Sequence, residues 1–145
     1  MNGHRACLIL SALLLVMLTC AAQLPVTGQK HVFALAKNAF LLDGKPFQII
    51  SGEMHPARIP KPYWRHRIQM AKAMGCNSIA VYIFWNYLET APGVFDFHSG
   101  NHDIAEFIRI CKEEGMWVLL RPGPYVCAEW DFGGLPTRFL AIEGL

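Results

Sequence analysis

The chain has 145 residues, of which 53% are hydrophobic, and a formal net charge of +2 at pH 7. A charge this close to zero, with no cluster of Lys and Arg, gives no electrostatic support for nucleic-acid binding. The length allows one domain, and four Trp and nine Phe are sufficient for a core or for stacking against a ligand.

Residues 1–22 have the layout of a secretory signal peptide. A weakly positive start is followed by an apolar run from Cys7 to Leu18 and then by small residues. The run is too short for a comfortable bilayer span, so a membrane anchor is less favoured and no stable span is expected. A third interpretation is a lipoprotein signal with a lipid on Cys20. We expect a secreted or periplasmic protein with a short leader at residues 23–30.

A small antiparallel meander is predicted after the leader. Apolar runs at His31–Leu35, Phe40–Leu42 and Phe47–Ile50 are separated by polar residues, and Asp43-Gly44 is a typical hairpin turn pair. We expect this meander to lead into a first core strand at Phe47–Ser51.

Three strand–helix units are predicted next. The expected strands are Phe47–Ser51, Ser78–Trp85 and Met116–Leu120, and the expected helices run from Pro62 or Tyr63 to Gly75 and from Asp103 to Gly115. Both helices carry apolar residues at helical spacing and end at glycine. Asp103 and Glu106 form a pair that resembles a capping box. A third helix is expected to begin within Leu135–Leu140.

Alternating strands and helices predict an α/β fold with a parallel sheet. The periodicity fits both a (β/α)₈ TIM barrel and a doubly wound sheet, but no Gly-rich phosphate loop follows any strand, which disfavours a nucleotide-binding sheet. A (β/α)₈ barrel typically has about 250 residues. We therefore expect residues 31–145 to be the N-terminal portion of a larger barrel, holding its first three βα units.

The cysteines and histidines do not indicate a metal or another cofactor. Cys76, Cys111 and Cys127 are too widely spaced for a disulfide framework or for the close pairs of a zinc site. Cys76 and Cys111 fall in apolar patterns, and we expect them to be buried as small hydrophobic residues. A bridge between two of the three cysteines stays open.

Polar and aromatic side chains are concentrated in Arg121–Pro136, which follows the third predicted strand. Prolines and glycines make this stretch a stiff loop. Parallel α/β enzymes hold their sites at the carboxyl ends of strands, so this loop is the first candidate for a site. From the residues alone, Glu129 is a surface carboxylate, a partner of Arg121 or a ligand-binding group.

Three motifs resemble the N-terminal part of the β-galactosidases of glycoside hydrolase family 35. They are Ser51–Pro60, Val81–Glu89 and Arg121–Trp130, closed by Gly133–Pro136, and each lies at the carboxyl end of a predicted strand. The resemblance implies a TIM barrel and retaining hydrolysis of terminal β-linked galactose from galactosides or glycans. Retention requires two carboxyl groups about 5–5.5 Å apart. The family places both catalytic glutamates in later segments, so no residue of this chain is predicted to be catalytic.

The resemblance assigns sugar binding to four residues. Tyr82 matches a tyrosine that touches the sugar, and Cys127, Ala128 and Glu129 match a segment that runs along the galactose. A carboxylate accepts several hydroxyl donors well, so Glu129 is expected to bind sugar hydroxyls. From Tyr82's place in an apolar strand, core packing is the alternative for that residue.

Other residues near these motifs have roles that the sequence leaves open. Trp85 and Trp130 either stack on a sugar face or form a wall of the pocket. Asn86 and Glu89 are expected to hold the loop, and His55 to pack at the end of the barrel. Arg58, Arg65 and Arg121 are expected to form ion pairs. The Glu53-Met54 and Pro56-Ala57 pairs depart from the residues of many family members.

Two further functions stay open beside the β-galactosidase. One is a non-catalytic galactoside-binding protein that keeps this part of the pocket, and the other is a barrel glycosidase with a different sugar preference. A later Asn-Glu after a fourth apolar strand, with a strand-end Glu further on, would distinguish the enzyme from the binding protein.

Overall fold

The computed structural model describes residues 30–142. The predicted signal peptide at 1–22, Cys20 and most of the leader lie outside the described residues. The chain divides into two units, residues 1–47 and residues 48–145.

The first unit holds a three-stranded antiparallel sheet in the order β1–β2–β3. The strands are β1 (Phe33–Leu35), β2 (Phe40–Leu42) and β3 (Lys45–Pro46). Asp43 and Gly44 form the turn between β2 and β3, with the positive φ values of 52° and 78° that a two-residue hairpin turn requires. The predicted meander is confirmed, but its third strand is not Phe47–Ile50, because pairing resumes directly after the turn.

The first strand of the second unit, β4, covers Ser51–Met54. The predicted start at Phe47 is therefore wrong. The side chain of Asn77 holds the preceding residues, since its Oδ1 accepts from Ile50 N over 3.0 Å and its Nδ2 donates to Gln48 O over 2.7 Å. These side-chain bonds take the place of ladder bonds, so regular pairing begins only at Ser51.

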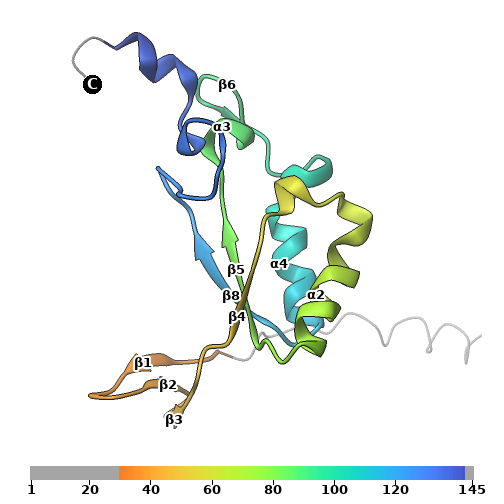
Figure 1. Cartoon of the computed structure of the whole chain (residues 1–145), viewed down its shortest axis with the longest axis vertical. Helices are drawn as coiled ribbons and strands as arrows, with labels where there is room; N and C mark the ends of the chain where they lie inside the picture. Colours follow the sequence, from red (N-terminus) through yellow and green to blue (C-terminus); the bar gives the residue numbers. More distant parts are fainter. Residues whose placement is uncertain (1–29, 143–145) are drawn as a thin grey trace, which may run out of the picture. The chain divides into compact units, whose positions relative to one another are not determined.

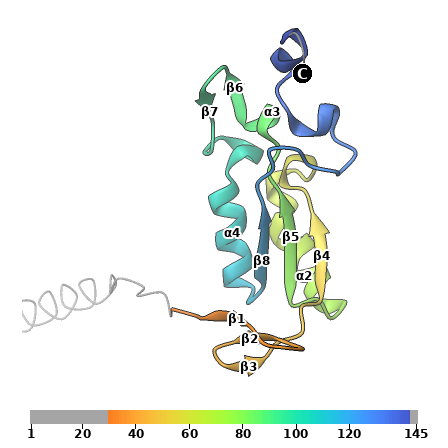
Figure 2. The ribbon, with the colours of Figure 1, turned by 90° about the vertical axis from the view of Figure 1, so that its left-hand side faces the viewer.

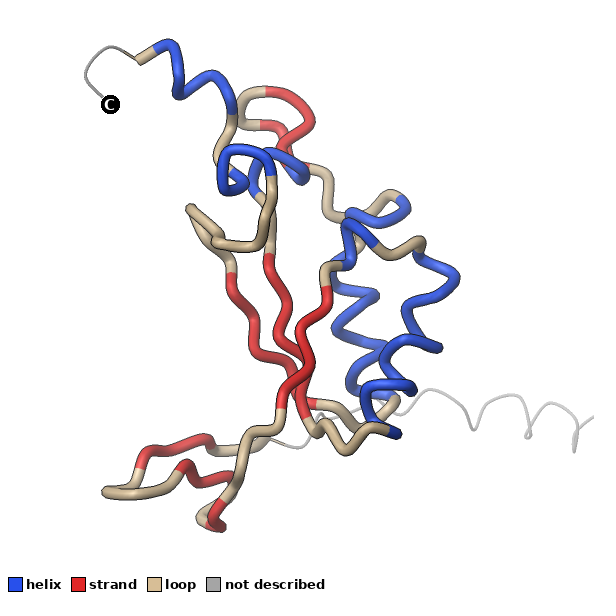
Figure 3. Tube along the Cα trace, viewed as in Figure 1, coloured by secondary structure: helices blue, strands red, loops and turns tan. Residues whose placement is uncertain are grey.

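Strands β4, β5 (Ser78–Tyr82) and β8 (Trp117–Arg121) form a parallel sheet in that order (Figure 3). Ser51 pairs with Ser78, and Ser78 pairs with Trp117. The carboxyl ends of all three strands therefore lie at the same end of the sheet. Helix α3 (Trp85–Leu88) and strand β6 (Glu89–Ala91) lie beyond that end (Figure 1).

Helices α2 (Trp64–Ala73) and α4 (Ile104–Glu113) cover one face of the parallel sheet (Figures 1 and 2). Their apolar faces and the sheet form one core, made of Trp64, Ile68, Ala71, Ile79, Val81, Phe107, Ile110, Cys111 and Met116. The rings of Trp64 and Phe107 meet edge to face, with centroids 5.3 Å apart. The helical spacing of apolar residues in the sequence is confirmed by this burial.

The start of α4 is capped as the sequence predicts. The side chain of Asp103 accepts a hydrogen bond from Glu106 N over 3.0 Å, which satisfies one of the free donors of the first turn. The Glu106 carboxylate pairs with Arg109, so it does not complete a reciprocal capping box.

Two predicted elements differ from the structure. The strand predicted for Ser78–Trp85 ends at Tyr82, because Phe84 O accepts from the N–H groups of Tyr87 and Leu88 and turns the chain into α3. A hairpin of β6 and β7 (Val94–Phe95), which the sequence did not indicate, follows α3. The helix predicted within Leu135–Leu140 is a 3₁₀ helix at Thr137–Ala141 and not an α-helix.

The fold class is mixed α/β, with a parallel sheet and a small antiparallel sheet. The parallel sheet does not close into a barrel within residues 30–142, where β4 and β8 are its edges. The face opposite the helices includes Trp117, which is 37% exposed. Unpaired strand edges favour association with other chains.

From this arrangement we expect residues 31–145, expressed alone, not to fold into a stable monomer. Thermal unfolding monitored by near-UV circular dichroism should show no cooperative transition, and a dye specific for exposed apolar surface should bind at room temperature. A soluble monomer with a cooperative melt and no dye binding would contradict this expectation.

Candidate functional site

Side chains from all three parallel strands meet at the carboxyl end of the sheet. Tyr82 of β5 pairs in register with Arg121 of β8, and the Arg121 guanidinium lies 4.0 Å from the centroid of the Tyr82 ring. Arg121 Nη1 also lies 3.6 Å from Oε2 of Glu53 in β4. One arginine thus contacts the other two strands, and its predicted ion pair is confirmed.

His55 extends these contacts into the segment after β4. Its Nε2 lies 2.8 Å from Glu53 Oε1, and its Nδ1 lies 2.5 Å from Arg58 Nη1. Because arginine only donates, Nδ1 accepts, so Nε2 carries the ring proton and donates it to Glu53. The ring also meets Tyr82 and Phe84 edge-on, with centroids 5.5 and 5.4 Å away. His55 therefore packs at the end of the sheet, as predicted.

The loop after β8 folds back on itself. Val126 N donates to Gly133 O over 2.8 Å. Gly133 has a φ of +60°, and a Cβ there would lie 2.1 Å from the ring of Tyr125, so this position requires glycine. Glu129 and Phe132 also have positive φ, of 45° and 48°, which is uncommon for residues other than glycine.

The segment Cys127–Glu129 lies in this loop. Ala128 is buried with Tyr82 and Phe84, whereas Cys127 and Glu129 are exposed. Among the described residues, the Glu129 carboxylate has no hydrogen bond or ion pair. Arg121 pairs with Glu53 instead, so the alternative of an Arg121–Glu129 pair is not found. The Glu129 carboxylate is therefore available to an external donor.

Trp130 joins the cluster of Tyr82, Phe84 and Ala128. Its ring stacks on Phe84 with centroids 4.1 Å apart and planes 9° from parallel. Its Nε1 donates to Asn86 Oδ1 over 2.8 Å, while Asn86 Nδ2 donates to Asp131 O over 3.0 Å. Asn86 thus holds the loop, as predicted, and the face of Trp130 toward Phe84 is already occupied.

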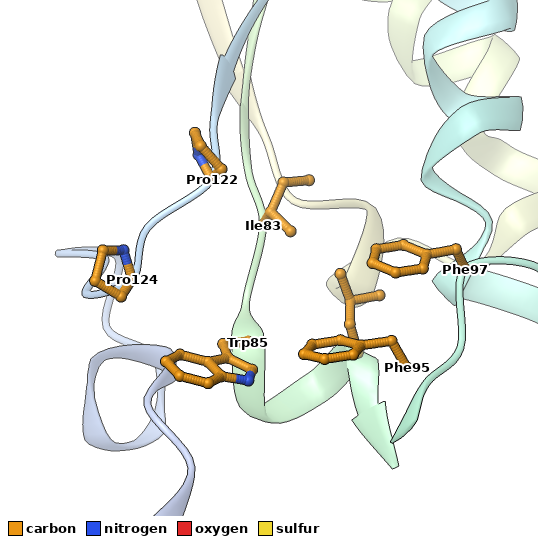
Figure 4. Close-up of a pocket in the computed structure, with 7 residues that line it drawn as sticks. Ile83, Trp85, Phe95, Phe97, Pro122 and Pro124 are labelled. Carbon is orange, nitrogen blue, oxygen red and sulfur yellow. The ribbon is translucent and has the colours of Figure 1, made fainter. Parts of the chain in front are cut away.

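Trp85 lies outside that cluster and lines an open apolar cavity of about 380 Å³ (Figure 4). The cavity is lined by Ile83, Trp85, Leu88, Phe95, Phe97, Pro122 and Pro124. Among the described residues, no carboxylate, amide or hydroxyl side chain lines it, and such groups are the ones that orient a polar ligand such as a sugar. The structure brings Tyr82, Ala128 and Trp130 together and does not bring Trp85 to them.

Glu89 and Arg138 form the most enclosed ion pair near these loops. The Glu89 side chain is 3% exposed, and Arg138 donates to both of its oxygens. Gly93 N donates to Glu89 Oε1 over 2.6 Å. The hydrogen bond from Arg138 lowers the pKa of the Glu89 carboxyl, although burial acts in the opposite direction. Glu89 therefore links the β6–β7 hairpin to the 3₁₀ helix at Thr137–Ala141, as predicted for a loop-holding residue.

The cysteines in the described part of the chain are free thiols. Cys111 is buried in the core, as predicted, whereas Cys76 is only partly buried and packs against that core. Burial raises the pKa of the Cys111 thiol to about 12. Within residues 30–142, no group of three or more His, Cys, Asp or Glu side chains is placed to hold a metal ion. No helix in that range is long and apolar enough to cross a membrane.

Arg58 makes hydrogen bonds to the loop after β8 that the sequence did not indicate. Its Nη2 donates to the carbonyl oxygens of Ala128, over 2.9 Å, and Glu129, over 2.6 Å. Among the described residues it forms no ion pair, so that prediction is wrong, whereas the prediction for Arg65 is confirmed by its pairs with Glu113 and Glu114. A residue-type pattern gives no signal for bonds to backbone carbonyls.

The fold and this cluster define an α/β protein whose charged and aromatic side chains gather at the carboxyl ends of parallel strands. That is the edge at which α/β enzymes bind their substrates. Residues 39–144 match the glycosyl hydrolases family 35, and the chain belongs to this family.

Several relatives share this segment. The chain is 49% identical over 105 residues to a β-galactosidase of Xanthomonas manihotis, which covers 72% of this chain and 17% of that protein. It is 42% identical over 147 residues to a β-galactosidase of Felis catus, covering 100% of this chain and 22% of that protein. It is 46% identical over 110 residues to a β-galactosidase of Homo sapiens, and that alignment covers 76% of this chain and 16% of that protein. The chain thus spans about a fifth of the length of these relatives.

Among solved structures, an exo-β-1,4-mannosidase, Op5Man5 from Opitutaceae bacterium strain TAV5, aligns with a TM-score of 0.44 and 21% identity. The alignment covers 66% of this chain and 18% of that chain.

The lowered pKa of Glu89 predicts that the ion pair between the β6–β7 hairpin and the 3₁₀ helix at Thr137–Ala141 stabilises the fold in a pH-dependent way. A carboxyl whose pKa is lower in the folded state adds stability above its ordinary pKa of 4.5 and loses it as the pH falls through the lowered value. In the full reading frame that carries this chain, Glu89→Gln should therefore lower the melting temperature most at neutral pH. The difference from the parent should shrink in acid.

The matched control is Glu113→Gln, which removes a carboxylate whose side chain is 39% exposed. Because exposed ion pairs contribute little, this change should shift the melting temperature less at neutral pH. Equal shifts for the two variants, or a Glu89→Gln shift independent of pH, would contradict the interpretation.

Proposed function

We propose that this chain provides part of the galactose-binding pocket of a retaining β-galactosidase. The substrates would be galactosides or glycans with a terminal, non-reducing β-D-galactose. Membership of glycosyl hydrolases family 35 and the β-galactosidase names of the relatives support this proposal. The binding residues proposed are Tyr82, Cys127, Ala128 and Glu129.

The observation that carries the proposal is that the Glu129 carboxylate is available for binding while its backbone is held in place. Its carboxylate is exposed and unpaired among the described residues, while its own carbonyl and that of Ala128 are bonded to Arg58. A fixed backbone with a free carboxylate suits an acceptor for neighbouring sugar hydroxyls, because hydrogen bonds to an ionised acceptor are the stronger kind. The adjacent Trp130, which is only partly buried, supplies apolar surface of the kind that a sugar ring requires beside its hydroxyls, whereas Tyr82 is buried beneath it and supports this surface by packing.

Hydrolysis needs two further groups. A retaining glycosidase uses one carboxyl group as acid and base and another as nucleophile. We propose that both lie in segments outside this chain, so that Glu129 binds the sugar and forms no covalent bond with it. Residues 31–145 alone should accordingly release no product from a chromogenic β-galactoside.

The role of Glu129 is tested by Glu129→Gln in the full reading frame. The amide keeps the shape of the side chain but loses the charge, so kcat/KM for a chromogenic β-galactoside should fall by about tenfold or more, as expected for the loss of one charge-assisted hydrogen bond. A covalent intermediate should still form with a slow 2-fluoro galactoside.

Mass spectrometry of the labelled protein separates the possible outcomes. A label on a glutamate outside this chain fits the proposal, whereas a label on Glu129 would contradict its assigned role. Galactoside binding without any turnover by the parent protein would favour the non-catalytic binding protein. Faster turnover of another glycoside would favour the glycosidase of different sugar preference.

We also propose that residues 1–22 direct export and are then removed. The apolar run from Cys7 to Leu18 and the small residues up to Ala22 support this. N-terminal sequencing of the exported protein should begin at Gln23. Retention of Met1 would contradict the proposal, and a lipid on Cys20 would identify an anchored form instead.

A further inference from the structure

One arginine joins two loops that are distant in the sequence. Arg58 lies in the segment after β4, and its Nη2 donates to the carbonyl oxygens of Ala128 and Glu129, 70 and 71 residues further along. Both bonds are made to the backbone, so they constrain the course of the loop regardless of the side chains it carries. The planar guanidinium suits this task, because its donors are fixed relative to one another.

The constrained position is one that the loop would not adopt readily by itself. Glu129 has a φ of 45°, in the left-handed region that a residue with a side chain rarely occupies. Such a conformation persists where surrounding contacts impose it. The 2.6 Å bond from Arg58 to Glu129 O is a direct contact of this kind.

Arg58 is itself held in place from two sides. Its Nη1 donates to His55 Nδ1 over 2.5 Å, and His55 Nε2 donates to Glu53 over 2.8 Å. The guanidinium also lies 5.1 Å from the ring centroid of Trp130 and 5.8 Å from that of Phe84. These contacts orient the guanidinium toward the loop before any ligand binds.

We infer that Arg58 is the positioning residue of the sugar-binding loop and that it acts without touching the sugar. It holds the Glu129 backbone in the left-handed conformation, and this conformation sets the direction of the free carboxylate. Without Arg58, two carbonyl groups lose their donor and Glu129 relaxes to an ordinary conformation, which moves the carboxylate away from the hydroxyls that it binds. The inference rests on the proposed function of Glu129.

The test compares Arg58→Lys and Arg58→Ala with the parent in the full reading frame, using a chromogenic β-galactoside. Lysine keeps the charge, but its ammonium lacks the planar arrangement in which Nη2 donates to both carbonyls while Nη1 donates to His55, so kcat/KM should fall about tenfold or more. Alanine should lower it by about 100-fold, the effect expected of a displaced binding group. KM should rise more than kcat falls, because the group that moves binds the sugar.

Two measurements distinguish positioning from a loss of folding. Added methylguanidine should restore part of the activity of Arg58→Ala, which a merely destabilised protein would not regain. Hydrogen exchange should increase at residues 126–133 and remain unchanged in α2. The matched control is Arg65→Ala, which removes an arginine paired with Glu113 and Glu114 and should leave KM unchanged.

The outcomes for Arg58 and for Glu129 can be told apart. A folded parent protein without turnover would contradict the proposed function. An active parent whose Arg58→Lys variant keeps the same kcat/KM and KM would overturn the inference about Arg58 alone. A lower melting temperature for Arg58→Lys, with kcat/KM and KM unchanged, would overturn it as well. Because lysine is the milder change, this variant decides the question even where Arg58→Ala fails to fold.

Discussion

The parallel pairing of β4, β5 and β8 determines where the candidate site residues lie. Neighbouring parallel strands place paired residues on the same face of the sheet, so Glu53, Tyr82 and Arg121 meet although they come from three separate motifs. The opposite face fixes this register, because Ile79 and Val81 are buried in the core beneath α2 and α4. A shift of one residue would turn these side chains away from the helices and the site residues toward them.

The core and the polar cluster make different contributions. Large apolar side chains such as Trp64 and Phe107 are fully buried, and each such burial stabilises the fold by about 1.5–3 kcal/mol. The Arg121–Glu53 pair is about half exposed on both sides and contributes little to stability. Its effect is to fix geometry, since it limits where the ends of β4, β5 and β8 can move relative to one another. The stability of this unit and the order of its strand ends thus arise from separate sets of residues.

Local patterns predicted those elements whose cause is local. The spacing of apolar residues and the terminal glycines located α2 and α4, and Asp43-Gly44 located the first hairpin. The predictions failed where a distant side chain decides the outcome. Asn77 delays the start of β4 through bonds to residues 27 and 29 positions earlier, and Arg138 holds the hairpin after α3 through Glu89. No pattern within a single segment contains these contacts.

The same distinction applies to the candidate site. Glu129 was assigned from its side chain by resemblance to a family motif, whereas Arg58 was missed because its partners are backbone carbonyls, which every residue possesses. The conformation of the loop and its chemistry are consequently separable. Arg58, Asn86 and Gly133 fix the backbone through contacts that do not depend on the residue at position 129. On the proposed function, the Glu129 carboxylate supplies the acceptor for sugar hydroxyls, so a different side chain there would alter what the loop binds while the contacts that fix its backbone stayed the same.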